Sequence, residues 1–325
     1  MTKARSITFI VPTYNSAVTL DRCLESIRRQ NYDPKLIELI VLDNGSSDDT
    51  IEIAHRYNSA LRQIPAVNIS KLRNVGADLA SSELLAFIDS DCEIDPGWTW
   101  LALEVLESQG AVAVGSPNLY SMQTSLVGRI INAQAVNFSG TRLYKWVPSA
   151  ALLVNRETFL GLNGFDQKLK TCEDVDFGYR LNRSGFKLAA NLGLTPKHHG
   201  DPATLNALLR KEYWRSSDSL ILLSKHPTEL REYLSNLYQI WFYLMLLLLL
   251  AAICCGSAVM AVLAVALFFI PVFAFSFRAW AQQDSKQSIK EICSYFATYY
   301  FARSFALFRG LDRLRSYYSS VDQTG

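Results

Sequence analysis

Asp89 and Asp91 stand directly after an apolar run at residues 84–88. Because the chain turns where a strand ends, two carboxylates one residue apart can both reach a single divalent cation. Carboxylate oxygens are hard ligands that suit Mg²⁺ or Mn²⁺, and a diphosphate can supply the remaining ligands. Surface turns often produce the same D-x-D pattern, so the pair predicts a metal site only together with other motifs.

A second acidic segment, D-N-G-S-S-D-D-T, follows the apolar run at residues 37–42. Its Asn-Gly pair predicts a turn, and Ser47 and Asp48 are typical caps of a following helix. Capping does not explain Asp43, an acid at the end of an apolar run. For Asp43 we expect a contact with the base or ribose of a nucleotide.

These residues fall where strand-like segments end. Strand-length apolar runs stand at residues 7–11, 37–42, 67–69, 84–88 and 111–114, and helical segments at 17–29, 50–57 and 98–108. The alternation predicts an α/β fold with a mostly parallel sheet flanked by helices, a Rossmann-like nucleotide-binding layout. Ligands of such sheets bind beyond the carboxyl ends of the strands.

Several classes of function are disfavoured. No G-x-G-x-x-G follows the first apolar run and no G-x-x-x-x-G-K-[ST] occurs, which argues against a dinucleotide dehydrogenase and a P-loop nucleotidase. A net charge of +2 gives no sign of a nucleic-acid partner. The six cysteines include no C-x-x-C pair, so we expect reduced thiols and neither disulfides nor a zinc site.

Four motifs follow one another along the chain. They are V-P-T-Y-N at residues 11–15, L-D-N-G-S-S-D-D-T at 42–50, R-N-V-G at 73–76 and I-D-S-D at 88–91. In this order they resemble the family 2 glycosyltransferases, and the resemblance covers residues 6–199. It implies a GT-A fold and an inverting, metal-dependent transfer from a nucleoside diphosphate sugar.

The resemblance also implies roles for single residues. By family likeness, the residues that would hold the nucleoside are Pro12, Thr13, Tyr14 and Asp43. Arg73 would lie near the nucleotide. Asp89 and Asp91 would bind the metal and the diphosphate. Members often place a histidine in an H-x-G setting that completes the metal site. His198 fits this setting and His199 is the alternative. Imidazole suits Mn²⁺ better than Mg²⁺.

The general base is implied by an E-D pair. Family members carry such a pair at the head of a helix after a G-F-D segment, and Glu173 and Asp174 match it here. The second acid is the usual base, so we expect Asp174 to take the acceptor proton, an effect of ~10²–10⁴ in rate. A preference of acids for a helix start is the competing explanation, which we favour for Asp176.

No charged side chain occurs from residue 233 to 277. A single helix of that length would measure ~67 Å against a hydrocarbon core of ~30 Å, so we predict a transmembrane hairpin with spans at about 237–255 and 258–277. A hairpin buried in a soluble protein is the alternative. Basic residues after the hairpin place both flanks in the cytoplasm. We therefore expect a catalytic domain at 1–225 and a membrane-associated region at 226–325.

Residues 292–308 are rich in aromatic side chains, with Arg303 as the one charge. This segment is either a third span or a helix lying in the interface with Arg303 turned toward headgroups, and we favour the interface. Trp241 and Trp280 are expected to be interface anchors. No apolar segment precedes the first strand, so a cleaved signal peptide is not expected.

The sequence therefore predicts a membrane-anchored, hexosyltransferase-type enzyme with a lipid-linked or other glycan acceptor, acting in cell-surface polysaccharide or glycolipid synthesis. The absence of Q-x-x-R-W favours single addition over processive synthesis. One alternative is a sugar-phosphate nucleotidyltransferase, which would carry a Gly-rich basic loop at residues 12–15. The other is a catalytically silent, membrane-tethered protein that binds nucleotide sugars.

Overall fold

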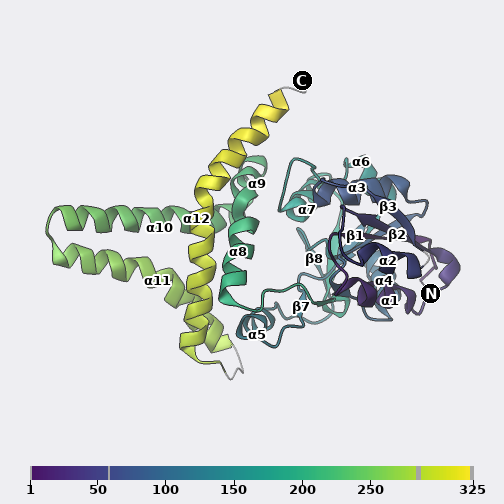
Figure 1. Cartoon of the computed structure of the whole chain (residues 1–325), viewed down its shortest axis with the longest axis horizontal. Helices are drawn as coiled ribbons and strands as arrows, with labels where there is room; N and C mark the ends of the chain where they lie inside the picture. Colours follow the sequence, from purple (N-terminus) through teal and green to yellow (C-terminus); the bar gives the residue numbers. More distant parts are fainter. Residues whose placement is uncertain (1, 58, 283–286, 323–325) are drawn as a thin grey trace. The chain divides into compact units, whose positions relative to one another are not determined.

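The computed structural model describes residues 2–57, 59–282 and 287–322 (Figure 1). Contacts within the chain divide it into two compact units. The first comprises Met1–Met122 with Ala135–Asp201, and the second Gln123–Gln134 with Pro202–Gly325. The domain boundary expected after residue 225 falls inside the second unit, at the end of helix α9 (Ser219–Lys225).

An eight-stranded sheet forms the centre of the first unit in the described part of the chain, in the order β3-β2-β1-β4-β9-β6-β10-β8. The strands are β1 (Ile7–Thr13), β2 (Ile37–Asp43), β3 (Ala60–Gln63), β4 (Leu84–Ile88), β6 (Ala113–Gly115), β8 (Thr141–Tyr144), β9 (Ala151–Asn155) and β10 (Leu188–Asn191). From β3 to β4 all neighbours are parallel, whereas β9 runs antiparallel to both β4 and β6. The sheet is mixed, and the predicted nucleotide motifs lie on its parallel half.

Side chains of the central strands alternate between two apolar cores, as a period of two requires. In β1, Phe9 and Val11 belong to one core and Ile10 to the other. The first core is completed by α1 (Leu20–Arg28), α2 (Thr50–Arg56) and α4 (Trp98–Gln109), and the second by α3 (Ile69–Leu79), α6 (Arg156–Gly161) and α7 (Glu173–Arg183). Helices therefore cover both faces of the sheet, as Figure 1 shows.

The strand predicted at residues 67–69 is wrong. Asn68 instead starts helix α3, because its side-chain oxygen accepts a hydrogen bond from Lys71 N at 2.9 Å. An apolar run this short does not distinguish a strand from the first turn of a helix. The actual edge strand β3 is largely exposed and has no apolar pattern by which sequence could have found it.

The second unit contains the two apolar helices. These are α10 (Leu230–Cys254) and α11 (Ala258–Gln282), which pack as a hairpin. Gly256 adopts a left-handed φ of 64°, and Ser257 N donates to Ala252 O at 2.9 Å, which closes the end of α10. Both helices are long and apolar enough to cross a membrane, with mean hydropathies of 2.2 and 2.7, as predicted. Only 22% and 11% of their most apolar windows are buried, which disfavours a hairpin hidden in a soluble core.

Pro271 lies inside α11 and lacks the N–H that would bond to the carbonyl of Leu267. The indole Nε1 of Trp241 in α10 donates to that carbonyl instead, at 3.2 Å. An unpaired carbonyl is costly in an apolar environment. Trp241, which the sequence suggested only as an interface anchor, therefore also supplies a hydrogen-bond donor between the two helices of the hairpin.

Residues 292–308 form the first half of α12 (Ile289–Asp322), which packs along α8 (Leu205–Arg215). The expectation that Arg303 turns toward headgroups is wrong, since its guanidinium lies 3.3 Å from Glu212 Oε2 on α8 and is 17% exposed. Further along α12, Arg313 Nε donates to the buried carboxylate of Asp218 at 2.8 Å. Buried charges need partners, so these two ion pairs fix α12 within the second unit.

Candidate active site

Three loops at the carboxyl ends of β1, β2 and β4 are joined by side-chain hydrogen bonds. Asn15, whose φ of 47° is left-handed, accepts from Ser47 N at 2.9 Å with its Oδ1. Asparagine tolerates this backbone conformation better than most residues. Ser16 Oγ lies 2.9 Å from Ser90 Oγ, which extends the network to the loop after β4. The motifs at residues 11–15, 42–50 and 88–91 are therefore brought together.

Asp43 is fully buried, and its carboxylate organises the loop that follows it. It accepts hydrogen bonds from Gly45 N and Ser46 N, both at 3.0 Å, and from the hydroxyls of Ser46 and Thr13. A buried carboxylate requires donors of this kind. Asp43 thus shapes the loop from within, and its predicted contact with a nucleoside stays a prediction.

The other residues predicted to hold the nucleoside differ in exposure. Pro12 and Thr13 are buried in β1, whereas the side chain of Tyr14 is 60% exposed and available to a ligand. On the neighbouring loop, Asp48 accepts from Thr50 N at 3.1 Å at the start of α2. The N-cap residue itself is Asp49, which makes no side-chain capping bond, and Ser47 contacts Asn15 instead. The hydrogen bond from the Thr50 hydroxyl lowers the pKa of Asp48.

Arg73 connects two carboxylates that are far apart in the sequence. It lies on α3 and is 3% exposed, with Nη2 donating to Asp89 Oδ1 at 2.5 Å and Nη1 to Glu173 Oε1 at 2.7 Å. Burial acts to lower the pKa of Arg73, but the two carboxylates raise it above its ordinary value. The guanidinium is therefore a fixed cation between the end of β4 and the start of α7.

Asn74 holds the G-F-D segment in place. Its Oδ1 accepts from Phe165 N at 2.9 Å and its Nδ2 donates to Phe165 O at 2.8 Å. Gly164 has a φ of 60°, and a Cβ there would lie 2.5 Å from Asn74 Oδ1. Glycine is therefore required at position 164. The two hydrogen bonds of Asn74 join the R-N-V-G and G-F-D segments, which precede α7 in the fold.

Helix α7 begins with Glu173 and Asp174, after Cys172 in a left-handed conformation with φ 63°. Asp174 is partly exposed, and its Oδ1 accepts from Val175 N at 2.8 Å. The positive end of the helix dipole favours its ionised form. Glu173 is buried, and burial raises its pKa to about 7; the charge of Asp174 adds to the rise and Arg73 opposes it.

Asp176 has a structural role. Its carboxylate is fully buried and accepts from Arg180 Nε at 2.8 Å. Arg180 also donates to the carbonyls of Leu162 and Gly164, at 2.6 and 2.7 Å. Asp176 also lies in the first turn of α7, where the explanation favoured from the sequence, a preference of acids for a helix start, applies.

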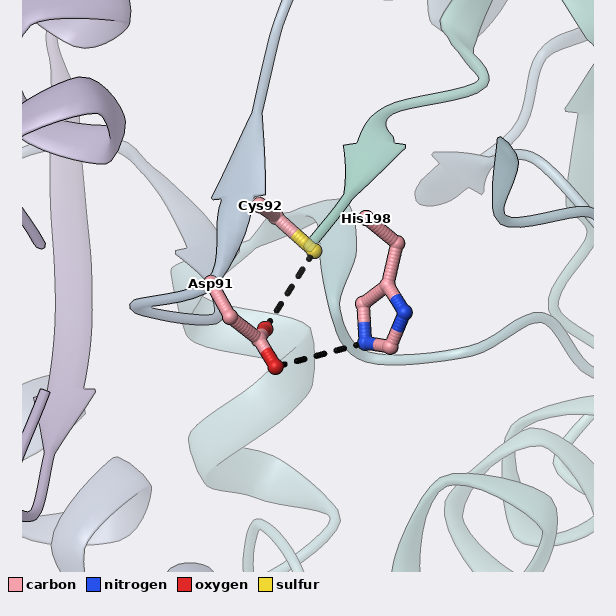
Figure 2. Close-up of side chains that lie close together, drawn as sticks. All are labelled: Asp91, Cys92 and His198. Carbon is pink, nitrogen blue, oxygen red and sulfur yellow. Dashed lines mark hydrogen bonds and ion pairs between the residues drawn. The ribbon is translucent and has the colours of Figure 1, made fainter. Parts of the chain in front are cut away.

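Asp91 and His198 are brought together by a small three-stranded sheet of β5 (Cys92–Glu93), β11 (Lys197–His198) and β7 (Tyr120–Ser121). His198 Nε2 lies 3.4 Å from Asp91 Oδ2 (Figure 2). On the other side of the ring, Nδ1 lies 2.8 Å from Asp201 Oδ2. A carboxylate on the far nitrogen fixes the orientation of a ligating imidazole. These oxygen and nitrogen donors fit a divalent cation.

The two histidines predicted as alternative metal ligands face different carboxylates. His199 Nε2 lies 3.4 Å from Glu93 Oε2, while His198 is the histidine that faces Asp91. Asp89 is not among the described side chains whose possible ligand atoms cluster with those of Asp91 and His198. Its carboxylate is bonded to Arg73, and its role as a further metal ligand stays a prediction.

Sequence reasoning missed three residues of this cluster. Asp201 lies beside the ring of His198, Cys92 lies directly opposite His198 in the β5–β11 pair, and Gly200 makes room for Asp91. A Cβ at position 200 would lie 1.8 Å from Asp91 Oδ2. Of these three residues, only Asp201 could have been suggested by the sequence, because it is an acid three residues after the candidate ligand His198.

The mixed sheet, with helices on both faces and acidic loops at its strand ends, is of the GT-A class predicted from sequence. Residues 8–180 match the family model for glycosyl transferase family 2, and the chain belongs to this family. It resembles the mannosyltransferase PcManGT from Pyrobaculum calidifontis, solved in complex with GDP-Man and Mn²⁺, with a TM-score of 0.64 at 17% identity over 95% of this chain and 88% of that chain.

Two curated relatives match shorter stretches. Glycosyltransferase AglE of Haloferax volcanii is 30% identical over 34% of this chain and 38% of its own length. Validoxylamine A glucosyltransferase of Streptomyces hygroscopicus subsp. limoneus is 27% identical over 57% of this chain and 49% of its own length. The chain thus spans less than half the length of both relatives.

Proposed function

We propose that the protein transfers a sugar from a nucleoside diphosphate sugar to a hydroxyl of a lipid-linked glycan acceptor, with inversion at the anomeric carbon. The role would be in cell-surface polysaccharide or glycolipid synthesis. Family membership supports the class of reaction. The observation that carries the proposal is the bridge from Arg73 to Asp89 and Glu173, which ties the acidic loop after β4 to the helix that bears Asp174.

Asp174 is the proposed base. Its carboxylate accepts the proton of the acceptor hydroxyl while that oxygen forms a bond to the anomeric carbon, and the bond from this carbon to the diphosphate breaks on the opposite side. Three features support this role: partial exposure, a place in the first turn of α7 and a buried cation nearby. Glu173, held by Arg73, positions the helix start and with it Asp174.

Asp91 and His198 would hold the divalent cation, Mg²⁺ or Mn²⁺, with Asp89 as the further predicted ligand. Such an ion neutralises charge on a departing diphosphate. The complex of PcManGT with GDP-Man and Mn²⁺ supports testing Mn²⁺ first. Asp201 keeps the imidazole of His198 in place, and Tyr14 is the accessible side chain on the nucleoside loop.

The hairpin α10–α11 supports a membrane location, with the catalytic unit on the cytoplasmic side. Basic residues stand near the end of α11 at Arg278 and after the hairpin at Lys290 and Arg309, in line with the positive-inside tendency. Anchoring would confine the enzyme and a lipid-linked acceptor to one surface. This raises their rate of encounter and gives the hairpin a function in the reaction.

The test is a donor panel. Membranes containing the protein are supplied with radiolabelled UDP-, GDP- and dTDP-sugars, including UDP-glucose and GDP-mannose, with Mn²⁺ or Mg²⁺. We expect one donor to release its nucleoside diphosphate and to label the lipid extract. Label only in soluble products would contradict a lipid acceptor. Release of pyrophosphate would indicate a nucleotidyltransferase, and no turnover of any donor would indicate a silent binding protein.

A further inference from the structure

We propose that Cys92 joins Asp91 and His198 in a site for Zn²⁺, in which zinc competes with the Mg²⁺ or Mn²⁺ used for transfer. No zinc motif is visible in the sequence because the donors come from two segments more than one hundred residues apart, paired as β5 and β11. The proposal shares Asp91 and His198 with the proposed function, but it does not require that sugar transfer occurs.

The geometry of the three side chains carries this inference. Cys92 and His198 are opposite residues of an antiparallel pair, so their side chains project from the same face of the ribbon. One donor atom from each of Asp91, Cys92 and His198 lies within 4.8 Å of the other two. Figure 2 shows the three side chains converging on one point.

The separations between these side chains are close to those of a zinc centre. Asp91 Oδ2 lies 3.4 Å from His198 Nε2, and Asp91 Oδ1 lies 3.8 Å from Cys92 Sγ. Tetrahedral zinc with bonds of ~2.0–2.3 Å places its ligand atoms about 3.3–3.8 Å apart. Each distance, taken from a different oxygen of Asp91, falls within the range for two ligands of one zinc ion.

The donor set selects the metal. Sulfur and imidazole nitrogen are favoured by Zn²⁺ and Co²⁺, whereas Mg²⁺ requires oxygen ligands in octahedral geometry. On binding, the thiol of Cys92 loses its proton to solvent as the sulfur–metal bond forms. Three protein ligands leave a fourth position for water or a diphosphate oxygen, as in catalytic zinc sites.

The surroundings are those of a built site. The side chains of His198 and Asp201 are each 8% exposed, and the Asp201 carboxylate, 2.8 Å from Nδ1, leaves Nε2 directed at Asp91. Because Gly200 has no side chain, the Asp91 carboxylate can lie close to the backbone at this position. Zinc held here would occupy the same aspartate and histidine as the activating ion, so transfer would fall as Zn²⁺ rises.

Cobalt spectroscopy on the full chain in detergent, with no nucleotide present, tests the proposal. We expect Co²⁺ to produce a sulfur-to-metal charge-transfer absorption in the near ultraviolet, and one equivalent of Zn²⁺ to abolish it. Cys92→Ser should remove the absorption. The matched control is Cys23→Ser, since Cys23 is also buried beside this loop, with its thiol donating to Asp89 O at 3.4 Å, but lies outside the cluster.

An absorption that is absent from the wild type, or unchanged in Cys92→Ser, would overturn the proposal. If Cys92→Ser does not fold, zinc retained after dialysis is compared between the wild type and His198→Gln. We expect one ion per wild-type chain and at least ~10-fold weaker binding in the variant; equal retention overturns the proposal. Because no donor is present, the result is independent of whether Asp174 catalyses transfer.

Discussion

Arg73 donates to Glu173 across a separation of 100 residues, at 2.7 Å, and both side chains are buried. A buried ion pair loses much of its Coulombic gain to desolvation. Glu173 reflects that cost, because burial raises the pKa of its carboxyl to about 7 in spite of the adjacent guanidinium. The pair therefore acts as a structural link between α3 and α7 whose strength depends on pH.

The first prediction concerns that dependence. Between the ordinary glutamate pKa of ~4.3 and about 7, the folded protein binds a proton that the unfolded chain has lost. Stability contributed by Glu173 is thus fully present at low pH and is lost as pH rises through 7, by up to about 3 kcal/mol. Relative to Glu173→Gln, the wild type should lose unfolding free energy from pH 5 to pH 8.

Denaturant unfolding of the wild type and Glu173→Gln in detergent, at several pH values, measures this difference. Glu157→Gln, at an exposed position of α6, is the matched control for the substitution. A constant difference between the wild type and Glu173→Gln across this range would mean that Glu173 titrates alike in the folded and unfolded chain.

The second prediction concerns the base. Asp174→Asn preserves the size of the side chain and its place in the first turn of α7 but removes the proton acceptor. We expect transfer to fall by ~10²–10⁴ or more, with nucleotide binding changed only a few-fold. Donor turnover and calorimetric binding of the nucleoside diphosphate are the measurements, with Asp78→Asn on the exposed side of α3 as control. Full activity would remove Asp174 from the mechanism.

The part of the fold that sequence could predict is the part determined by local patterns. The short continuous apolar runs around Phe9 and Phe87 identified strands, and the uncharged stretch of 233–277 identified the hairpin. The strand β3 had no such pattern, and the three apolar letters at residues 67–69 indicated the wrong element. Antiparallel β9, which makes the sheet mixed, depends on pairing between distant segments that a linear pattern does not encode.

The same distinction applies to the site. Family-like motifs identified Arg73, Asp89, Glu173 and His198, but not which of them contact one another. Arg73 has partners 16 and 100 residues away, and His198 has Cys92 opposite it across a strand pair. Burial was equally hidden, since the position of Asp43 at a strand end did not show that its carboxylate is enclosed by its own loop.

The third prediction concerns Gly200. A Cβ at this position would lie 1.8 Å from Asp91 Oδ2, the far end of a side chain, so the carboxylate must move while the backbone stays. Gly200→Ala should therefore fold normally but bind Mn²⁺ ~10-fold or more weakly. Gly161→Ala is the control, because a Cβ there meets nothing within 4 Å. Equal Mn²⁺ affinities by titration would show that Asp91 does not hold the ion.

The fourth prediction concerns the hairpin, in which Trp241 donates to the carbonyl that Pro271 leaves unpaired. Trp241→Phe removes the donor and should destabilise the hairpin by about 1 kcal/mol, the usual range for such bonds between membrane helices. In a Pro271→Ala background the new N–H bonds to Leu267 O, so the same substitution should cost much less. Both backgrounds lose the same indole surface. A difference between the two costs therefore reports only whether the carbonyl of Leu267 has a hydrogen-bond donor.

Unfolding of the four proteins of this cycle in mixed micelles, with Trp280→Phe in α11 as a control for loss of an exposed indole, measures the coupling. Equal costs of Trp241→Phe in both backgrounds would mean that the indole contributes by packing only. If Trp241→Phe destabilises only the protein that keeps Pro271, the indole of Trp241 compensates for the N–H that Pro271 lacks. Pro271 would then be tolerated because a neighbouring helix supplies the missing donor.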